Sequence, residues 1–199
     1  MLLLDVSSAF SPDAWTSKVL GASLAVRAGR IEAAVTATGA GLTRLASDDL
    51  TKSGYEAAID AGAPDVVGFL CHGTPSAVLG AGLQPMLDTF ASAPRVANRV
   101  FCLTACFAGQ KLAPALMAAG AAAVFAYDES LIFDEVSLPE IVRCATVADG
   151  SALAGRTVKQ IAADVRAAYD AAIAAAENHQ NVSLQQHLQH ALDCFVSFG

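Results

Sequence analysis

The chain has 199 residues, of which 54% are hydrophobic and 16% charged, and its formal net charge at pH 7 is −7. This composition excludes a disordered polar chain, and the acidic balance without a basic cluster argues against nucleic acid as a partner. The longest apolar run, residues 112–127, contains Pro114 and Gly120, so it is too short and too interrupted to cross a membrane. No linker or repeat divides the sequence, and we expect a single domain over residues 1–199.

The cysteines and the N-terminus indicate the compartment. Five cysteines occur without any C-x-x-C spacing, which favours reduced thiols in a cytoplasmic protein over a disulfide framework. The N-terminal apolar run contains Asp5 and has no basic region before it, so it predicts a buried strand and not a secretion signal.

Short apolar runs bounded by turn residues predict the strands. The strongest are residues 2–6, 66–71, 99–104 and 122–127, and a weaker one is 42–45. Each run is apolar nearly throughout instead of alternating with polar residues, as in strands that are covered on both faces.

Helix signals lie between and after these runs. A first helix is predicted to open at an N-cap at Ser11, and a second at Thr51, ending at residues 62–64. Two more are predicted at 83–93 and 110–119, a long one within 151–178, and a last one at 183–195. Alternating strands and helices predict an α/β fold, with a mostly parallel sheet flanked by helices and a helical C-terminal part over 151–199.

Reactive side chains follow two of the predicted strands. His72 and Gly73 come after the run 66–71, and Ala105 and Cys106 come after the run 99–104. If these strands are parallel neighbours, with the predicted 83–93 helix in the crossover, both ends meet at the same edge of the sheet. We therefore expect His72 and Cys106 to lie close together.

This pairing suits nucleophilic chemistry. A cysteine thiol with a pKa of about 8.5 is mostly protonated at neutral pH, and a nearby imidazole can accept its proton. Cys106 also precedes a predicted helix, whose N-terminus favours an anion. The N–H groups of Gly73 and Cys106 are candidates for an oxyanion hole.

The residues 66–73 (VVGFLCHG) and 100–109 (VFCLTACFAG) resemble the two-block signature of the caspase-like cysteine peptidases. This superfamily includes caspases, metacaspases, legumains, gingipains, separases and the bacterial CHAT domains. Residues 112–128 are similar to the CHAT pattern in particular, and the resemblance spans roughly residues 40 to 175.

The resemblance implies a caspase-like α/β/α sandwich that cleaves a protein or peptide substrate through a thioester acyl-enzyme, without cofactor or metal. Cys106 then becomes the nucleophile, His72 the general base, and Gly73 with Cys106 the oxyanion hole. It also implies a bacterial regulatory or defence effector, controlled by a separate activator or by homodimerisation.

The sequence allows alternative interpretations of the substrate pocket and of the activity. Asp128 either lines the pocket, which would favour a basic side chain before the scissile bond, or belongs to an ordinary acidic loop. Thr104 stands where these families often have an acid or glutamine, and Phe107 also departs from their pattern. An inactive caspase-like module that binds a protein partner is therefore an alternative, as is another thiol hydrolase or acyltransferase acting on a small molecule.

Two structural alternatives remain for single residues. Cys106 taken alone is more often a buried structural thiol. His187 and His190 have the i, i+3 spacing of metal ligands, but we expect a solvated helix face because no acid or cysteine nearby completes a set.

Overall fold

A computed structural model describes residues 1–7, 14–45 and 49–199. Its main sheet has six strands in the order β2-β1-β3-β7-β8-β9, and only β9 is antiparallel to its neighbour. The strands are β1 (Leu2–Ser7), β2 (Gly41–Arg44), β3 (Val66–Leu70), β7 (Val100–Thr104), β8 (Ala123–Tyr127) and β9 (Phe195–Phe198). The predicted α/β class and its mostly parallel sheet are confirmed.

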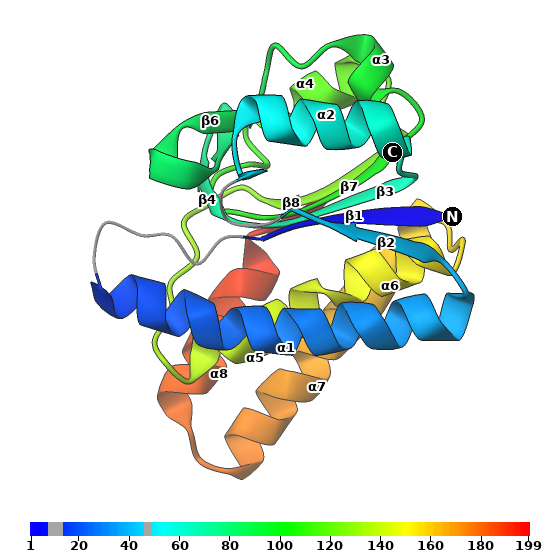
Figure 1. The fold of residues 1–199 in the computed structure, drawn as a ribbon. Helices are drawn as coiled ribbons and strands as arrows, with labels where there is room; N and C mark the ends of the chain where they lie inside the picture. The colour runs from blue at the N-terminus through cyan, green and yellow to red at the C-terminus, as the bar shows by residue number, and fades with distance from the viewer. Residues whose placement is uncertain (8–13, 46–48) are drawn as a thin grey trace.

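Helices cover both faces of the sheet (Figure 1). One face carries α2 (Lys52–Gly62), α3 (Ala93–Val96) and α4 (Leu112–Ala118). The other carries α1 (Ala14–Thr38), α5 (Ser137–Ala145), α6 (Val147–Leu153), α7 (Val158–Asn178) and α8 (Val182–Asp193). The N-cap predicted at Ser11 lies outside the described residues, whereas Thr51 caps α2 as predicted by accepting a hydrogen bond from Gly54 N.

The sheet separates two apolar cores. Leu3, Val66 and Phe125 face the core under α5 to α8, while Leu4 and Val67 face the core under α2 and α4. Successive residues of one strand thus enter opposite cores, because strand side chains alternate between faces. This explains why the strand sequences are apolar throughout.

A buried ion cluster joins two helices to the sheet. Arg27 of α1 lies 2.9 Å from Asp5 of β1 and 3.1 Å from both carboxylate oxygens of Asp149 of α6. Burial acts to lower the pKa of Arg27, but the charges of Asp149 and Asp5 outweigh it and raise the pKa. Any side chain at Gly68 of β3 would overlap this cluster, so glycine leaves the room that the ion pairs need.

The helix predicted at 83–93 is wrong. That part of the crossover forms a 3-10 turn at Ala81–Leu83 and then β6 (Pro85–Asp88), which builds a small antiparallel sheet with β4 (His72–Thr74) and β5 (Ala77–Leu79). Gly82 and Leu83 both have positive φ, 62° and 58°, and Pro85 follows two residues after Leu83, so a helix cannot continue through them.

The helix predicted within 151–178 is two helices. α6 ends at Leu153 and α7 begins at Val158, because Gly155 adopts a positive φ of 70° and Thr157 forms a capping box with Gln160.

The C-terminal part is not wholly helical. α8 ends at Asp193, before the predicted end at 195, and the chain returns to the sheet as β9 beside β8. No helix was predicted over α5.

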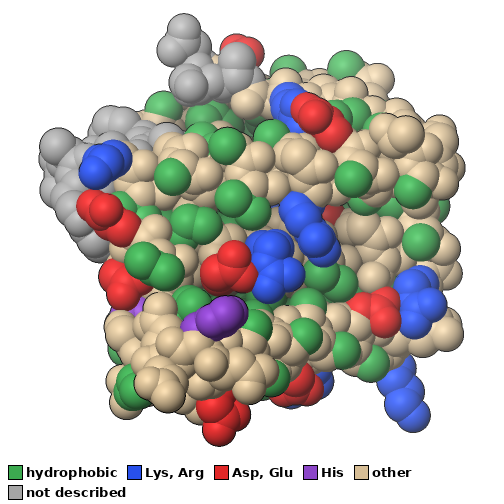
Figure 2. Space-filling model, turned by 90° about the horizontal axis from the view of Figure 1, so that it is seen from below, with side chains coloured by type: hydrophobic (Ala, Val, Ile, Leu, Met, Phe, Trp, Pro, Cys, Tyr) green, Lys and Arg blue, Asp and Glu red, His purple; other side chains and the backbone are tan. Residues whose placement is uncertain are grey.

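The face of the molecule on the side of α1 and α5 to α8 carries both charged and apolar side chains. Figure 2 shows acidic and basic side chains interspersed over this face, with small hydrophobic side chains between them. Among the helices of the described residues, none has the length and apolar character that a membrane span requires.

Candidate functional site

The candidate site lies where β3 and β7 end. These strands are parallel neighbours with Leu70 opposite Thr104, and Cys71 N donates a hydrogen bond to Thr104 O over 3.3 Å. His72 and Cys106 therefore leave the sheet at the same edge, two residues after paired positions. Both residues line one pocket.

Gly73 packs directly on the backbone of Cys106. A Cβ at position 73 would overlap the Cys106 carbonyl oxygen and would lie 3.0 Å from the Cys106 nitrogen and 2.9 Å from the Ala105 Cβ. Only glycine permits this approach. The contact brings the backbone of the histidine segment against the backbone of the cysteine.

The loop after β8 holds the turn that carries Cys106. Phe107 N donates to Glu129 O over 3.0 Å, and Phe107 itself has a positive φ of 61°. Leu131 N donates to Cys106 Sγ over 3.3 Å, and Ser130 Oγ lies 3.9 Å from the same sulfur. Residues 130 and 131 thus place two hydrogen-bond donors beside the sulfur.

One electrostatic expectation for Cys106 is wrong. The following helix, α4, begins only at Leu112, and residues 106–111 form turns instead. The thiol therefore does not sit at a helix N-terminus.

Two polar groups at the site have no hydrogen-bond partner among the described residues. His72 Nε2 is buried and makes no hydrogen bond. The Cys106 N–H likewise donates none within the described part of the chain. Buried polar groups are nearly always paired, so the unpaired His72 Nε2 is an exception, which it shares with Tyr55 Oη and Arg99 Nε among the described residues.

The pocket beside these residues is small and mostly apolar. It encloses about 40 Å³, and Thr104 lines it together with His72 and Cys106. Its remaining walls are Leu20, Leu70, Cys71, Ala105, Leu131, Phe133 and Leu138. Asp128 is not part of the lining; its backbone N donates to Cys194 O, and its backbone O accepts from Gln110.

Cys106 differs from the other cysteines in exposure. It is half-buried, whereas Cys71, Cys102, Cys144 and Cys194 are buried. Burial raises the pKa of Cys102 well above its usual value, and burial above all raises the pKa of Cys144 and of Cys194 to about 11. Among the thiols, Cys106 is thus the one that solvent and reagents reach.

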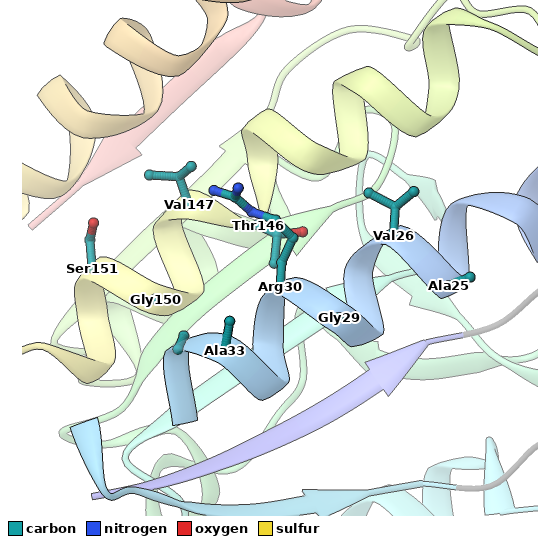
Figure 3. A pocket seen from close by; sticks show the side chains of 10 residues that line it. Ala25, Val26, Gly29, Arg30, Ala33, Thr146, Val147, Gly150 and Ser151 are labelled. Carbon is teal, nitrogen blue, oxygen red and sulfur yellow. The ribbon is translucent and has the colours of Figure 1, made fainter. Parts of the chain in front are cut away.

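A larger cavity lies elsewhere. It is an open groove of about 630 Å³ between α1 and α6, lined mainly by small residues, with Arg30 extending from α1 toward Val147 (Figure 3). Neither His72 nor Cys106 contributes to it, so it is separate from the candidate site.

The two helical histidines have different partners. His187 Nδ1 lies 2.9 Å from Ser137 Oγ, whereas His190 lies with Cys194 and Glu129. An acid and a cysteine thus lie beside His190, which was not expected, whereas His187 is not part of this group. Cys194 is four residues after His190, and this spacing places both on one helix face.

Neither a protein-family model nor a curated protein sequence matches the chain. The structure is similar to a solved chain in the complex of the pro- and mature domains of RgpB from Porphyromonas gingivalis, with a TM-score of 0.58 and 16% sequence identity. The similarity covers 100% of this chain and 46% of that chain, so the present chain spans about half the length of the solved one. RgpB is a gingipain, one of the groups in the superfamily named above. At this identity the similarity concerns the fold, and the chain has an α/β fold like that of the caspase-like cysteine peptidases.

Proposed function

We propose that the chain is a cysteine peptidase, with Cys106 as nucleophile and His72 as general base. The observation that carries the proposal is the meeting of both residues in one pocket, just beyond the ends of the neighbouring parallel strands β3 and β7. The caspase-like fold supports the same reaction class.

The proposed reaction has two steps. His72 accepts the Cys106 thiol proton, and the sulfur attacks the carbonyl carbon of a peptide bond. The N–H groups of Cys106 and Gly73 stabilise the oxyanion of the tetrahedral intermediate. The intermediate collapses to a thioester when His72 returns the proton to the leaving amine. Water then attacks the thioester while His72 accepts its proton, which regenerates the thiol and releases a carboxylic acid.

The lining of the pocket bears on the substrate. Apolar side chains from Leu70, Leu131, Phe133 and Leu138 face the space beside Cys106, and Asp128 does not line it. We propose that the side chain next to the scissile bond is small and apolar, which matches this lining and the pocket volume of about 40 Å³. A basic preference through Asp128 has no support from this lining.

A library of fluorogenic peptides tests the proposal. Wild-type protein is expected to cleave peptides with a small apolar side chain at that position, and Cys106→Ala and His72→Ala are each expected to lose at least about 10³-fold in kcat/KM. His179→Ala is the matched control, because His179 is exposed at the end of α7 and remote in sequence from the dyad.

Two results decide against the proposal. Cleavage that persists in Cys106→Ala refutes the assignment of the nucleophile. Absence of cleavage together with alkylation of Cys106 no faster than that of Cys71 favours a caspase-like module without turnover.

A further inference from the structure

Three metal-binding side chains meet where α8 ends beside the loop that follows β8. They are Glu129, His190 and Cys194, and their ligand atoms all lie within 4.8 Å of one another. Cys194 Sγ is 3.9 Å from Glu129 Oε2 and 3.8 Å from His190 Nδ1. None of these residues takes part in the chemistry proposed above.

The distances suit a tetrahedral ion. Zinc bonds of about 2.0–2.3 Å at tetrahedral angles place neighbouring ligand atoms roughly 3.5 Å apart. The two distances from the Cys194 sulfur exceed this value by a few tenths of an ångström. Small side-chain rotations are enough to close that difference, because Glu129 is exposed and His190 only half-buried.

The histidine is oriented by a second contact. His190 Nε2 lies 2.8 Å from the Ser130 carbonyl oxygen, which can only accept, so Nε2 carries the proton and donates it. In that tautomer Nδ1 carries no proton and can bind an ion; Cys194 Sγ lies 3.8 Å from Nδ1 and 3.5 Å from Nε2. Histidines that bind metals commonly donate the other ring N–H to a backbone carbonyl in this way.

The backbone also brings the three residues together. Asp128 N donates to Cys194 O over 3.0 Å, and Tyr127 pairs with Phe195 across β8 and β9. Glu129 is therefore fixed beside the end of α8 by main-chain contacts. The carboxylates of Asp128 and Asp193 also interact electrostatically with Cys194. The surroundings of the three side chains therefore carry negative charge, which favours the binding of a cation.

We propose that Glu129, His190 and Cys194 bind a Zn²⁺ ion through a carboxylate oxygen, an imidazole nitrogen and a thiolate. The combination of thiolate and imidazole selects zinc over calcium and magnesium, which prefer oxygen ligands. A water molecule completes the tetrahedral set. The ion ties α8 to the segment 129–131, whose Leu131 N contacts Cys106 Sγ.

Cobalt and zinc titrations test this site directly. Co²⁺ in place of zinc gives a near-ultraviolet absorption when a thiolate is a ligand. The titration is run on the Cys106→Ala protein, so that the signal cannot come from the candidate nucleophile. We expect one ion per chain, displacement of cobalt by zinc, and a rise in Tm of about 5–10 °C at a zinc concentration near 100 Kd.

Variants identify the ligands. Glu129→Gln and His190→Asn are each expected to raise the Kd for Co²⁺ at least about tenfold, and Cys194→Ser to abolish the thiolate absorption. Glu177→Gln and His179→Asn serve as controls, because both residues are exposed and lie outside the cluster. Absence of the absorption in excess cobalt, or a Kd unchanged by both Glu129→Gln and His190→Asn, overturns the proposal.

Discussion

Substitution of Gly73 by alanine tests the packing of the candidate site. The new Cβ would overlap the Cys106 carbonyl oxygen and would lie 2.9 Å from the Ala105 Cβ, where carbon atoms normally stand about 3.5–4.0 Å apart. The two backbone segments must therefore separate by roughly 1 Å. We expect a loss of about 1–3 kcal/mol in the free energy of unfolding, as for other overpacked positions.

The same displacement acts on the proposed chemistry. A shift of about 1 Å in a reacting group typically costs about 100-fold in rate, so kcat/KM for a cleaved peptide is expected to fall by that factor. Urea unfolding followed by circular dichroism measures the first effect, and peptide hydrolysis the second.

Gly21→Ala is the matched control for Gly73→Ala. A Cβ at position 21 meets no atom within 4 Å, and the residue lies inside α1. Alanine there should stabilise the protein by about 0.5–1 kcal/mol. If Gly73→Ala is as stable and as active as the wild type, the close approach of residue 73 to Cys106 is wrong.

Two further predictions concern the buried carboxylates of the Arg27 cluster and the carboxylate of Asp134, which precedes α5. Arg27→Met should lower the free energy of unfolding by about 3–5 kcal/mol in urea titrations, because Asp149 is left buried without its partner and Asp5 keeps only its longer ion pair with Arg44; a loss under about 0.5 kcal/mol would contradict this. At the start of α5, burial acts to raise the pKa of Asp134, but hydrogen bonds from the Ser137 backbone and side chain outweigh it and lower the pKa. Because the folded pKa lies below the unfolded one, this carboxylate stabilises the fold above about pH 4 and loses that effect as the pH falls through the folded pKa. Asp134→Ala should therefore cost about 1 kcal/mol at pH 7 and distinctly less near pH 3 in thermal unfolding, and a cost independent of pH would refute the assignment.

The parallel strands were predictable because their signal is local. Burial between two helical layers requires a run that is apolar at every position, and turn residues end each run, as in Val66–Leu70 and Val100–Thr104. The order of these runs and helices then leads to the sheet, and the sheet to the shared edge of His72 and Cys106.

The 83–93 segment was not predictable from spacing. Met86 and Leu87 are buried, and a pair of apolar neighbours fits a helix and a strand equally well. The strand forms because Gly80 and Ala81 pack against the backbone of Leu50, which is distant in sequence. Ala81 N donates a hydrogen bond to Leu50 O over 2.7 Å. A contact between segments so far apart in the chain cannot be predicted from the local spacing of apolar residues.

The surroundings of Cys106 depend on a loop that returns from the next strand. Ser130 and Leu131 reach the sulfur only because the segment after β8 folds back over the turn at 106–111. Two members of the metal-site cluster, His190 and Cys194, could be placed together from the sequence, because residues at i and i+4 share one face of a helix. Glu129 joins them only through the pairing of β8 with β9.

The most direct test of the central claim is the rate at which iodoacetamide alkylates Cys106 between pH 6 and pH 10, in wild-type protein and in His72→Gln. Mass spectrometry of the labelled peptides separates Cys106 from the buried cysteines, and a Tm close to that of the wild type shows that the variant is folded. If His72 accepts the Cys106 proton, the variant should react at least about tenfold more slowly at pH 7 and approach the wild-type rate near pH 10. Equal rates for the two proteins across this pH range would contradict a Cys106–His72 dyad.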